Sequence, residues 1–447
     1  MPPSERVGTV PESISRIIMK LLAKTAEERY QTAAGVEHDL RRCWSEWQQQ
    51  GHISPFTLDE HGRSHRLVIS EKLYGRESAV EDLVSAFGRI VQSDGTGLVL
   101  VSGYSGMGKS SVVNELHKAL VPLRGLLASG KFDQYKRDIP YSTLVQAFQG
   151  LVRTLLGKSD AELDGWRTAL LEALDLNGRL MTDLMPELKL IIGEQPMVPD
   201  LEPQQAQRRF LLVFSRFIGV FARAEHPLVL FLDDLQWLDT ATLDLIDDLL
   251  TRSSLRHLML IGAYRNNEVA ADHPLRQKLQ TMRSAGVPID EITLTPLAIG
   301  HIEQLITDAL HTEPTPIKPL AQLVHDKTAG NPFFVIQFLH ALAEEKLLNF
   351  DHDRRQWEWD TDRIHAKGYT DNVVDLMAGR LNRLPHSTLQ ALQQMACLGN
   401  VVDISTLATV MGIPRAQLHR ELWVAIRQEL IERSDGVYLF AHDRIHE

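Results

Sequence analysis

The sequence is poor in cysteine: among 447 residues only Cys43 and Cys397 occur, far apart and in helical patterns. This spacing disfavours a disulfide framework and a zinc site built on cysteine pairs, and it suits a reducing compartment. No apolar run is long enough to span a bilayer, and no apolar signal core stands near the N-terminus. We therefore expect a cytoplasmic protein with no membrane partner.

The sequence also has few basic residues relative to acidic ones: 47 Lys and Arg against 58 Asp and Glu, which gives a formal net charge of −11. Such a balance disfavours non-specific binding to nucleic acid. The hydrophobic content of 44% and the charged content of 23% are ordinary for a globular protein. The length allows about two to four domains. The helical pattern at 441–447 stops abruptly, so we expect a piece of a longer protein.

The most informative segment is 103–110, which reads GYSGMGKS and fits the pattern G-x-x-x-x-G-K-[ST]. It follows an apolar run at 97–102 that predicts a buried parallel strand, and it precedes a helical pattern at 111–120. Strand, glycine loop and helix in this order predict a phosphate-binding loop. A glycine-rich turn without a ligand is the alternative, and a second motif downstream argues against it.

In such a loop the backbone N–H groups and the start of the helix surround a polyphosphate. Lys109 can reach the β- and γ-phosphates, and the hydroxyl of Ser110 can bind Mg²⁺. We therefore expect ATP and Mg²⁺ as cofactors. The other loop residues that we expect to line the phosphates are Gly103, Ser105, Gly106, Met107, Gly108 and Ser111.

The second motif is the apolar run 227–232 followed by Asp233 and Asp234. Its pattern predicts a buried strand whose carboxyl end presents two carboxylates, at the edge where open α/β sheets bind ligands. Asp233 is the candidate metal ligand, and Asp234 is the candidate group that polarises the attacking water. Acids after a strand are common in loops, but the pairing with the glycine loop makes this motif specific.

The patterns predict an α/β fold: a P-loop NTPase core with a parallel sheet, then a helical lid and a winged-helix-like domain. Three histidines in a polar stretch (52, 61 and 65) lack ligand spacing and indicate a solvated linker. The predicted strands of the core are 97–102, 126–132, 227–233, 257–265 and 289–294. The predicted divisions are helices at 1–47, a linker at 48–70, the core at 71–297, the lid at 298–383 and the winged-helix-like part at 384–447.

Five segments together resemble STAND-type P-loop ATPases of the AAA+ class, in the order seen in that family. The closest likeness is the ATPase module of bacterial signalling proteins, where it lies between a Ser/Thr protein kinase domain and sensor and histidine-kinase domains. The resemblance covers residues 71–447 and implies such covalently linked domains as partners. The segments that carry it are the glycine loop, 232–239 (LDDLQWLD), 264–265 (YR), 294–297 (LTPL) and 328–334 (TAGNPFF).

The resemblance assigns further site residues. Tyr74, Gly75 and Arg76 match a box that lies beside the adenine and ribose. Arg265 matches a sensor position that faces the γ-phosphate and would act in catalysis with Lys109; the alternative is a surface arginine that caps a strand. Pro332 matches a lid proline that packs on the base, and it could equally be the first residue of a helix.

Two departures from the family pattern bear on turnover. Asp234 stands where fast AAA+ ATPases carry glutamate, and the shorter acid reaches water less well. No distinct arginine finger is visible, and Arg208 and Arg209 are candidates only because they are basic. Both points favour a slow ATPase that acts as a switch, and they leave homo-oligomerisation open.

Residues 20–31 resemble the last helices of a protein-kinase C-lobe, with Arg29 at a position that pairs with a buried glutamate in kinases. The alternative is a pair of capping helices. The chain has no kinase glycine loop, H-R-D or D-F-G motif, so this fragment is not a kinase.

A DNA-binding regulator that uses the winged helix is the alternative function. Residues 380–447 hold seven basic and seven acidic residues and no basic recognition helix. This balance disfavours DNA contact, so no nucleic-acid partner is expected.

Overall fold

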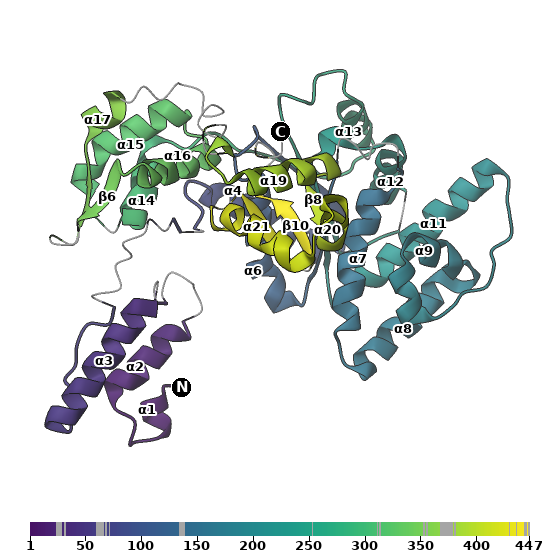
Figure 1. The fold of residues 1–447 in the computed structure, drawn as a ribbon. Coiled ribbons are helices and arrows are strands. Elements are labelled where there is room, and N and C mark those ends of the chain that lie inside the picture. The colour runs from purple at the N-terminus through teal and green to yellow at the C-terminus, as the bar shows by residue number, and fades with distance from the viewer. Residues whose placement is uncertain are drawn as a thin grey trace. The chain divides into compact units, whose positions relative to one another are not determined.

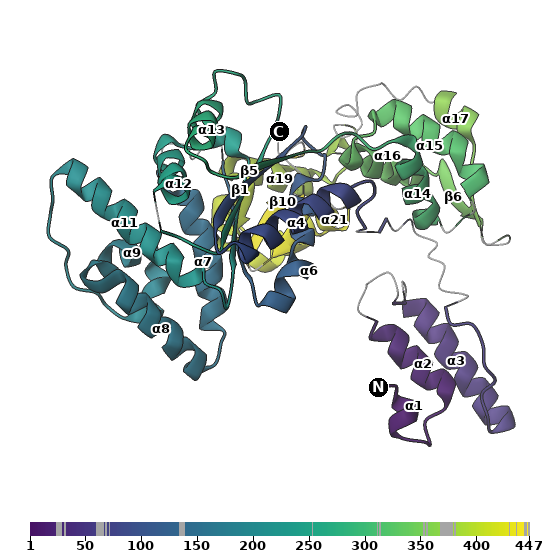
Figure 2. The same cartoon turned by 180° about the vertical axis from the view of Figure 1, so that it is seen from behind.

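The chain divides into two compact units (Figures 1 and 2), which we describe separately. The N-terminal unit comprises Met1–Tyr74, Leu297–Gly330 and Phe334–Leu376, and the sheet unit comprises Gly75–Pro296, Asn331–Phe333 and Met377–Glu447. The computed structural model describes residues 1–23, 29–30, 33–59, 67, 69–70, 72–133, 139–252, 254–310, 312, 314–351, 354, 356–366, 379, 381–428, 430–434, 436–441 and 445.

The sheet unit is built on five parallel strands in the order β2-β3-β4-β1-β5. The strands are β1 (Thr96–Ser102), β2 (Leu126–Lys131), β3 (Leu228–Asp233), β4 (Leu258–Tyr264) and β5 (Ile289–Thr293), so all five predicted strands are confirmed. The register pairs Ser102 with Tyr264 and with Thr293, and Lys131 with Asp233. The carboxyl ends of the strands therefore share one edge, where the two sequence motifs meet.

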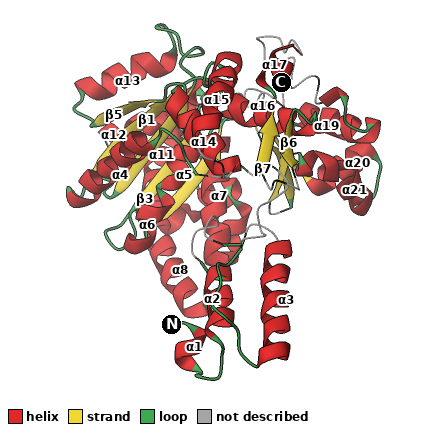
Figure 3. Ribbon diagram, turned by 90° about the vertical axis from the view of Figure 1, so that its left-hand side faces the viewer, coloured by secondary structure: helices red, strands yellow, loops and turns green. Residues whose placement is uncertain are grey.

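Helices flank this sheet (Figure 3). They include α4 (Glu77–Gln92), α5 (Lys109–Glu115), α7 (Ser142–Leu156) and α12 (Thr240–Thr251), and α5 covers the first part of the helical pattern expected at 111–120. The sequence analysis did not single out α13 (Pro274–Ser284), whose polar residues weaken the pattern. The remaining helices of this part are α6 (His117–Leu120), α8 (Asp160–Leu174), α9 (Gly178–Leu184), α10 (Lys189–Ile192) and α11 (Pro203–Phe221).

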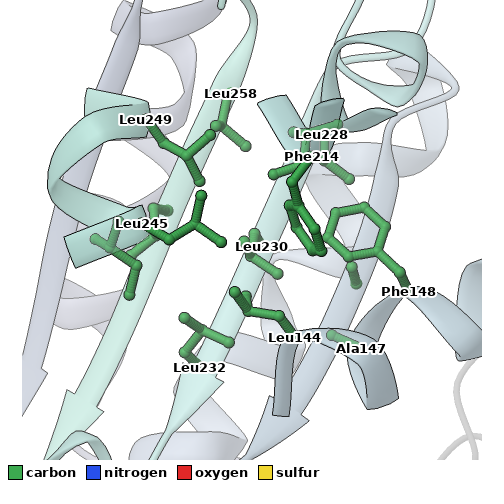
Figure 4. Close-up of a cluster of buried hydrophobic side chains, with 14 of the residues drawn as sticks. Leu144, Ala147, Phe148, Phe214, Leu228, Leu230, Leu232, Leu245, Leu249 and Leu258 are labelled. Carbon is green, nitrogen blue, oxygen red and sulfur yellow. The ribbon is translucent and has the colours of Figure 1, made fainter. Parts of the chain in front are cut away.

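Burial on one face of the sheet anchors α7, α11 and α12. Leu228, Leu230 and Leu232 alternate along β3 and so share a face. Figure 4 shows Phe148 of α7 and Phe214 of α11 on one side of these leucines, and Leu245 and Leu249 of α12 on the other. Phe148 has no exposed surface and stacks edge-on against Phe214 and Phe217. This packing fixes the strand that carries Asp233.

The N-terminal unit begins with α1 (Pro3–Arg6), α2 (Glu12–Leu21) and α3 (Ala33–Gln50), where Ile17, Cys43 and Phe56 form a small core. Residues 24–28 and 31–32 of the predicted kinase-like segment lie outside the described residues. A separate core joins α14 (Ile299–Leu310), α15 (Pro314–Thr328), α16 (Pro332–Glu344), the hairpin β6 (Leu348–Asp351) and β7 (Gln356–Trp359), and α17 (Thr361–Ala366). Residues 367–378 of the predicted lid lie outside the described residues.

The C-terminal part has its own core and is winged-helix-like, as predicted. It consists of α19 (His386–Leu398), β8 (Val401–Asp403), α20 (Ile404–Met411), α21 (Arg415–Arg427), β9 (Ile431–Ser434) and β10 (Val437–Phe440). The three strands form an antiparallel sheet in the order β8-β10-β9. Within the described part of the chain, no helix is both long and apolar enough to cross a membrane.

Candidate nucleotide site

The glycine loop joins β1 to α5 at the carboxyl edge of the sheet. Gly106 and Gly108 adopt positive φ angles of 83° and 82°, a backbone region that favours glycine. A Cβ added at Gly106 would lie 2.5 Å from Oδ1 of Asn331, so this position also lacks room for a side chain. A Cβ added at Gly103 would lie 3.0 Å from the backbone carbonyl oxygen of Leu294, which is a tight contact. Two glycines of the motif are thus required by the fold around the loop.

Lys109 is the first residue of α5 and is folded back over the loop. Its ammonium group donates hydrogen bonds of 3.1 Å to the carbonyl oxygens of Gly103 and of Tyr104. The residue is only 8% exposed. The positive charge therefore stays inside the curve of the loop, where the first N–H groups of α5 also have no partner within the helix. This arrangement suits an anionic group.

Ser110 and Asp233 meet at the start of α5 and the end of β3. The hydroxyl of Ser110 donates a 2.6 Å hydrogen bond to Oδ2 of Asp233, whose Oδ1 accepts one of 2.9 Å from the backbone N–H of Asp234. A hydroxyl and a carboxylate at this separation are the hard oxygen ligands that Mg²⁺ prefers. The two residues fit a magnesium site in which each supplies one oxygen.

Asp234 follows Asp233 directly, and several side chains contact its carboxylate. It is 3% exposed and adopts a left-handed backbone conformation with φ of 58°. Its Oδ1 accepts a 2.7 Å hydrogen bond from Nε2 of Gln236 and lies 3.5 Å from Nε of Arg265. Its Oδ2 lies 3.4 Å from Nζ of Lys131. The carboxylate that would polarise water is therefore neutralised by two cations.

Arg265, at the end of β4, is buried and not a surface residue, since it is only 3% exposed. Its backbone N–H donates to Oε1 of Gln236, and its guanidinium group donates to Glu268 at 2.9 Å. The same group lies 5.0 Å from the ring centre of Trp237. Gln236 thus joins Asp234 to Arg265 directly, with one hydrogen bond to each.

Arg76 contacts the backbone of the glycine loop. One of its nitrogens, Nη2, donates to the carbonyl oxygens of Met107 at 3.2 Å and of Thr295 at 2.8 Å. Burial lowers the pKa of the guanidinium group from its ordinary value. Nη1 donates to the carbonyl of Gly75, which has a positive φ of 61°. Arg76 therefore fixes loop backbone.

Tyr74 belongs to the N-terminal unit, where it is buried and its hydroxyl donates to Oδ2 of Asp308 at 2.8 Å. Its assignment to the nucleotide stays a prediction. Ser111 is exposed in the first turn of α5. Arg209 donates to the carbonyl of Pro199, and Arg208 is exposed on α11, so neither gains support as an arginine finger from the described contacts.

The start of α16 is bonded to the glycine loop. The amide of Asn331 donates to the carbonyl oxygen of Ser105 at 2.8 Å, and the backbone N–H of Phe333 lies 3.3 Å from the carbonyl oxygen of Gly106. Oδ1 of Asn331 also accepts from the N–H of Phe333, which caps the helix. Pro332 is its first residue, as one interpretation expected.

Four residues of this site were assigned no role from sequence: Lys131, Gln236, Asn331 and Phe333. Gln236, Asn331 and Phe333 lie inside the segments 232–239 and 328–334 that carry the resemblance, and that membership was the signal available from sequence. Lys131 is the last residue of β2 and pairs in register with Asp233. Only the strand order reveals that contact.

Comparison with known proteins agrees with this geometry. Residues 72–261 match the AAA ATPase domain family. The chain is 29% identical over 95% of its length to the hybrid signal transduction histidine kinase G of Dictyostelium discoideum, and 23% identical over 98% to histidine protein kinase 1 of Candida albicans. It spans only 14% and 21% of those two proteins. These relatives are eukaryotic histidine kinases, so they do not support the expected bacterial Ser/Thr kinase context.

Among solved structures, the chain is similar to the STAND protein PH0952 of Pyrococcus horikoshii, with a TM-score of 0.47 and 11% identity, over 85% of this chain and 42% of that one. It is also similar to the ORC2 protein of Aeropyrum pernix, with a TM-score of 0.41 and 12% identity, over 85% and 92%. The sheet order, the glycine loop and the matched domain define an α/β P-loop NTPase fold of AAA type.

Proposed function

We propose that this chain is an ATP-binding, slowly hydrolysing signal-transduction module whose two nucleotide states differ in conformation. The observation that carries the proposal is the meeting of Lys109, Ser110 and Asp233 at one sheet edge, with Asp234 beside them. Lys109 would bind the terminal phosphates, and Ser110 and Asp233 would hold Mg²⁺. Bound Mg²⁺ would withdraw charge from the phosphates.

The state of Asp234 supports slow turnover. Lys131 and Arg265 both lie within 3.5 Å of its carboxylate, and Gln236 bonds to it. A carboxylate that is paired with two cations is a weaker base, since these charges favour its ionised form. Asp234 would polarise water only after these contacts loosen, so hydrolysis is slow in the arrangement described.

The same contacts support a switch. Arg265 and Lys131 are cations close to the loop edge, and a γ-phosphate would compete with Asp234 for them. ATP and ADP would then make different contacts with the same residues, which is the condition for a ligand to shift a conformational equilibrium. The relatives connect this module to longer signalling proteins, and we propose linked sensor and kinase domains as its partners. No described feature favours the DNA-binding alternative.

Calorimetric titration of the chain with ATP and ADP, with and without Mg²⁺, tests the proposal. The wild type should bind both nucleotides more tightly with Mg²⁺, and Lys109→Ala should lose binding because the charge inside the loop is gone. Lys118→Ala is the matched control, since Lys118 is an exposed lysine of the next helix that pairs with Glu115. Equal affinity of Lys109→Ala and wild type would disprove the assignment.

A further inference from the structure

A second pocket lies at the opposite edge of the same sheet. Its volume is about 1110 Å³, and it is lined by α11, the turn at 222–225, the end of α12 and residues 254–257. These segments lead into β3 and β4, which begin at Leu228 and Leu258. The glycine loop follows the carboxyl end of β1, so the second pocket is separate from the nucleotide site.

The pocket is rich in arginine, and we call it the arginine pocket. Its five arginines face only two carboxylates, those of Glu225 and Asp248; they are Arg208, Arg216, Arg223, Arg252 and Arg256. All five arginines are exposed. In the described part of the chain, no ion pair or side-chain hydrogen bond involves any of the five guanidinium groups. This concentration of positive charge contrasts with the net charge of −11 of the whole chain.

Apolar side chains lie between the arginines. Leu212 is 53% exposed, although it belongs to a helix that packs on the core, and Leu211 and Leu255 are half-buried beside it. Arg208, Leu212 and Arg216 follow one another at four-residue spacing on α11, so they share a face of the helix. Along this face of α11, an exposed leucine therefore lies between two arginines.

We propose that the arginine pocket binds an acidic amphipathic helix of a partner protein. Guanidinium groups pair with carboxylates in two-pronged hydrogen bonds, and the exposed leucine between them would pack against an apolar residue of the helix. The residues of α11 that line the pocket run from Arg208 to Gly219, about 17 Å along the helix at about 1.5 Å per residue. A partner helix of about 15 residues is long enough to cover that length.

Two features of the pocket argue against nucleic acid. None of its described lining residues is a Phe, Tyr or Trp on which bases could stack. The exposed Leu212 has no role in binding a phosphate backbone. An acidic helix uses the arginines and the leucine together, and so accounts for both.

Fluorescence anisotropy tests the proposal with the whole chain and a labelled synthetic helix of about 15 residues, with Glu at i and i+4 and Leu at i+3 and i+7. Arg216→Glu and Arg252→Glu should each weaken binding about tenfold, because each reverses a charge that faces the peptide. Arg420→Glu, at an exposed arginine of α21, is the matched control and should leave affinity unchanged. A circular dichroism spectrum and a melting temperature like those of wild type in all three variants show that they are folded.

Four results would overturn the proposal. They are a failure of the wild type to bind the peptide, equal affinity for a peptide with Gln in place of Glu, tighter binding of an oligonucleotide of similar length, and self-association of the chain that Arg216→Glu abolishes. No binding by the wild type would show that the pocket is not a site for such a helix, and equal affinity for the Gln peptide would show that charge does not drive binding. The oligonucleotide and self-association results would assign the pocket to nucleic acid or to a second copy of the chain. None depends on the nucleotide site.

Discussion

The side-chain amide of Asn331 donates a 2.8 Å hydrogen bond to the backbone carbonyl of Ser105, across 226 positions of sequence. The same side chain caps α16 through the N–H of Phe333, and its oxygen fills the space beside Gly106. One residue therefore fixes both the start of a helix and the middle of the glycine loop.

We predict that Asn331→Ala weakens ATP binding about fivefold, since one buried hydrogen bond contributes about 1 kcal/mol. The loop would lose its anchor at Ser105 while Lys109 and Ser110 remain in place. Calorimetry measures the affinity, with Asn349→Ala as control because Asn349 bonds only locally, to the carbonyl of Lys346. Equal ATP affinities for Asn331→Ala and wild type would show that the loop holds its shape alone.

Magnesium dependence should reside in Ser110 and Asp233. Asp233→Asn should remove most of the gain in ATP affinity that Mg²⁺ gives, because an amide oxygen carries no full charge for the ion. Ser110→Ala should reduce that gain less, since water can replace the hydroxyl. The measurement is a titration with ATP at several Mg²⁺ concentrations. A full response to Mg²⁺ in Asp233→Asn would place the metal elsewhere.

Much of this site could be predicted from sequence, because its parts are local patterns. The glycine loop and the run that ends at Asp233 each predict a strand, a turn and a ligand, phosphate or Mg²⁺, within about ten residues. The contact of Lys131 with Asp234 could not be predicted, because it depends on β2 lying beside β3. Strand order is a property of distant packing, and no local pattern in the chain encodes it.

Some elements of the fold could not be predicted from sequence for similar reasons. The strands β8 and β9 have three and four residues, too few for an alternating pattern to stand out. Helix α13 is polar at most of its positions and buries only Leu275, Leu279 and Met282. The buried state of Arg265 could not be predicted either, since its ion pair with Asp234 depends on β4 lying beside β3 and its ion pair with Glu268 on the turn after β4.

The packing of Phe148 predicts a large stability effect. This side chain has no exposed surface and contacts Phe214, Phe217 and Phe221. Phe148→Ala should lower the free energy of unfolding by about 3–5 kcal/mol, because a cavity forms beneath β3. Denaturant unfolding followed by fluorescence measures the change. Leu171→Ala, at a partly exposed site on α8, should lower the free energy of unfolding much less. Equal losses in the two variants would show that Phe148 is not part of the core.

Turnover should depend on Asp234. Asp234→Asn should keep ATP affinity and lower the hydrolysis rate at least about a hundredfold, since an amide cannot accept a proton from water. Phosphate release measures the rate. Asp272→Asn, at an exposed acid in the loop after β4, is the control and should hydrolyse like wild type. Unaltered hydrolysis by Asp234→Asn would remove this residue from catalysis.

The last prediction concerns Arg265 and the two nucleotide states. We expect an ATP analogue that resists hydrolysis, but not ADP, to change protease cleavage at 295–300 and 347–372, the second of which lies partly outside the described residues. Arg265→Ala would remove the buried cation that pairs with Asp234 and Glu268 and cost about 3 kcal/mol or more, so a change in cleavage could reflect lost stability instead of lost switching. Arg265→Lys keeps the charge, but its single ammonium group cannot reach Asp234, Glu268 and a phosphate at once. We predict that Arg265→Lys binds ADP like wild type and gives the same cleavage pattern with either nucleotide. A preserved difference between the two patterns in Arg265→Lys would show that the γ-phosphate is sensed by another residue.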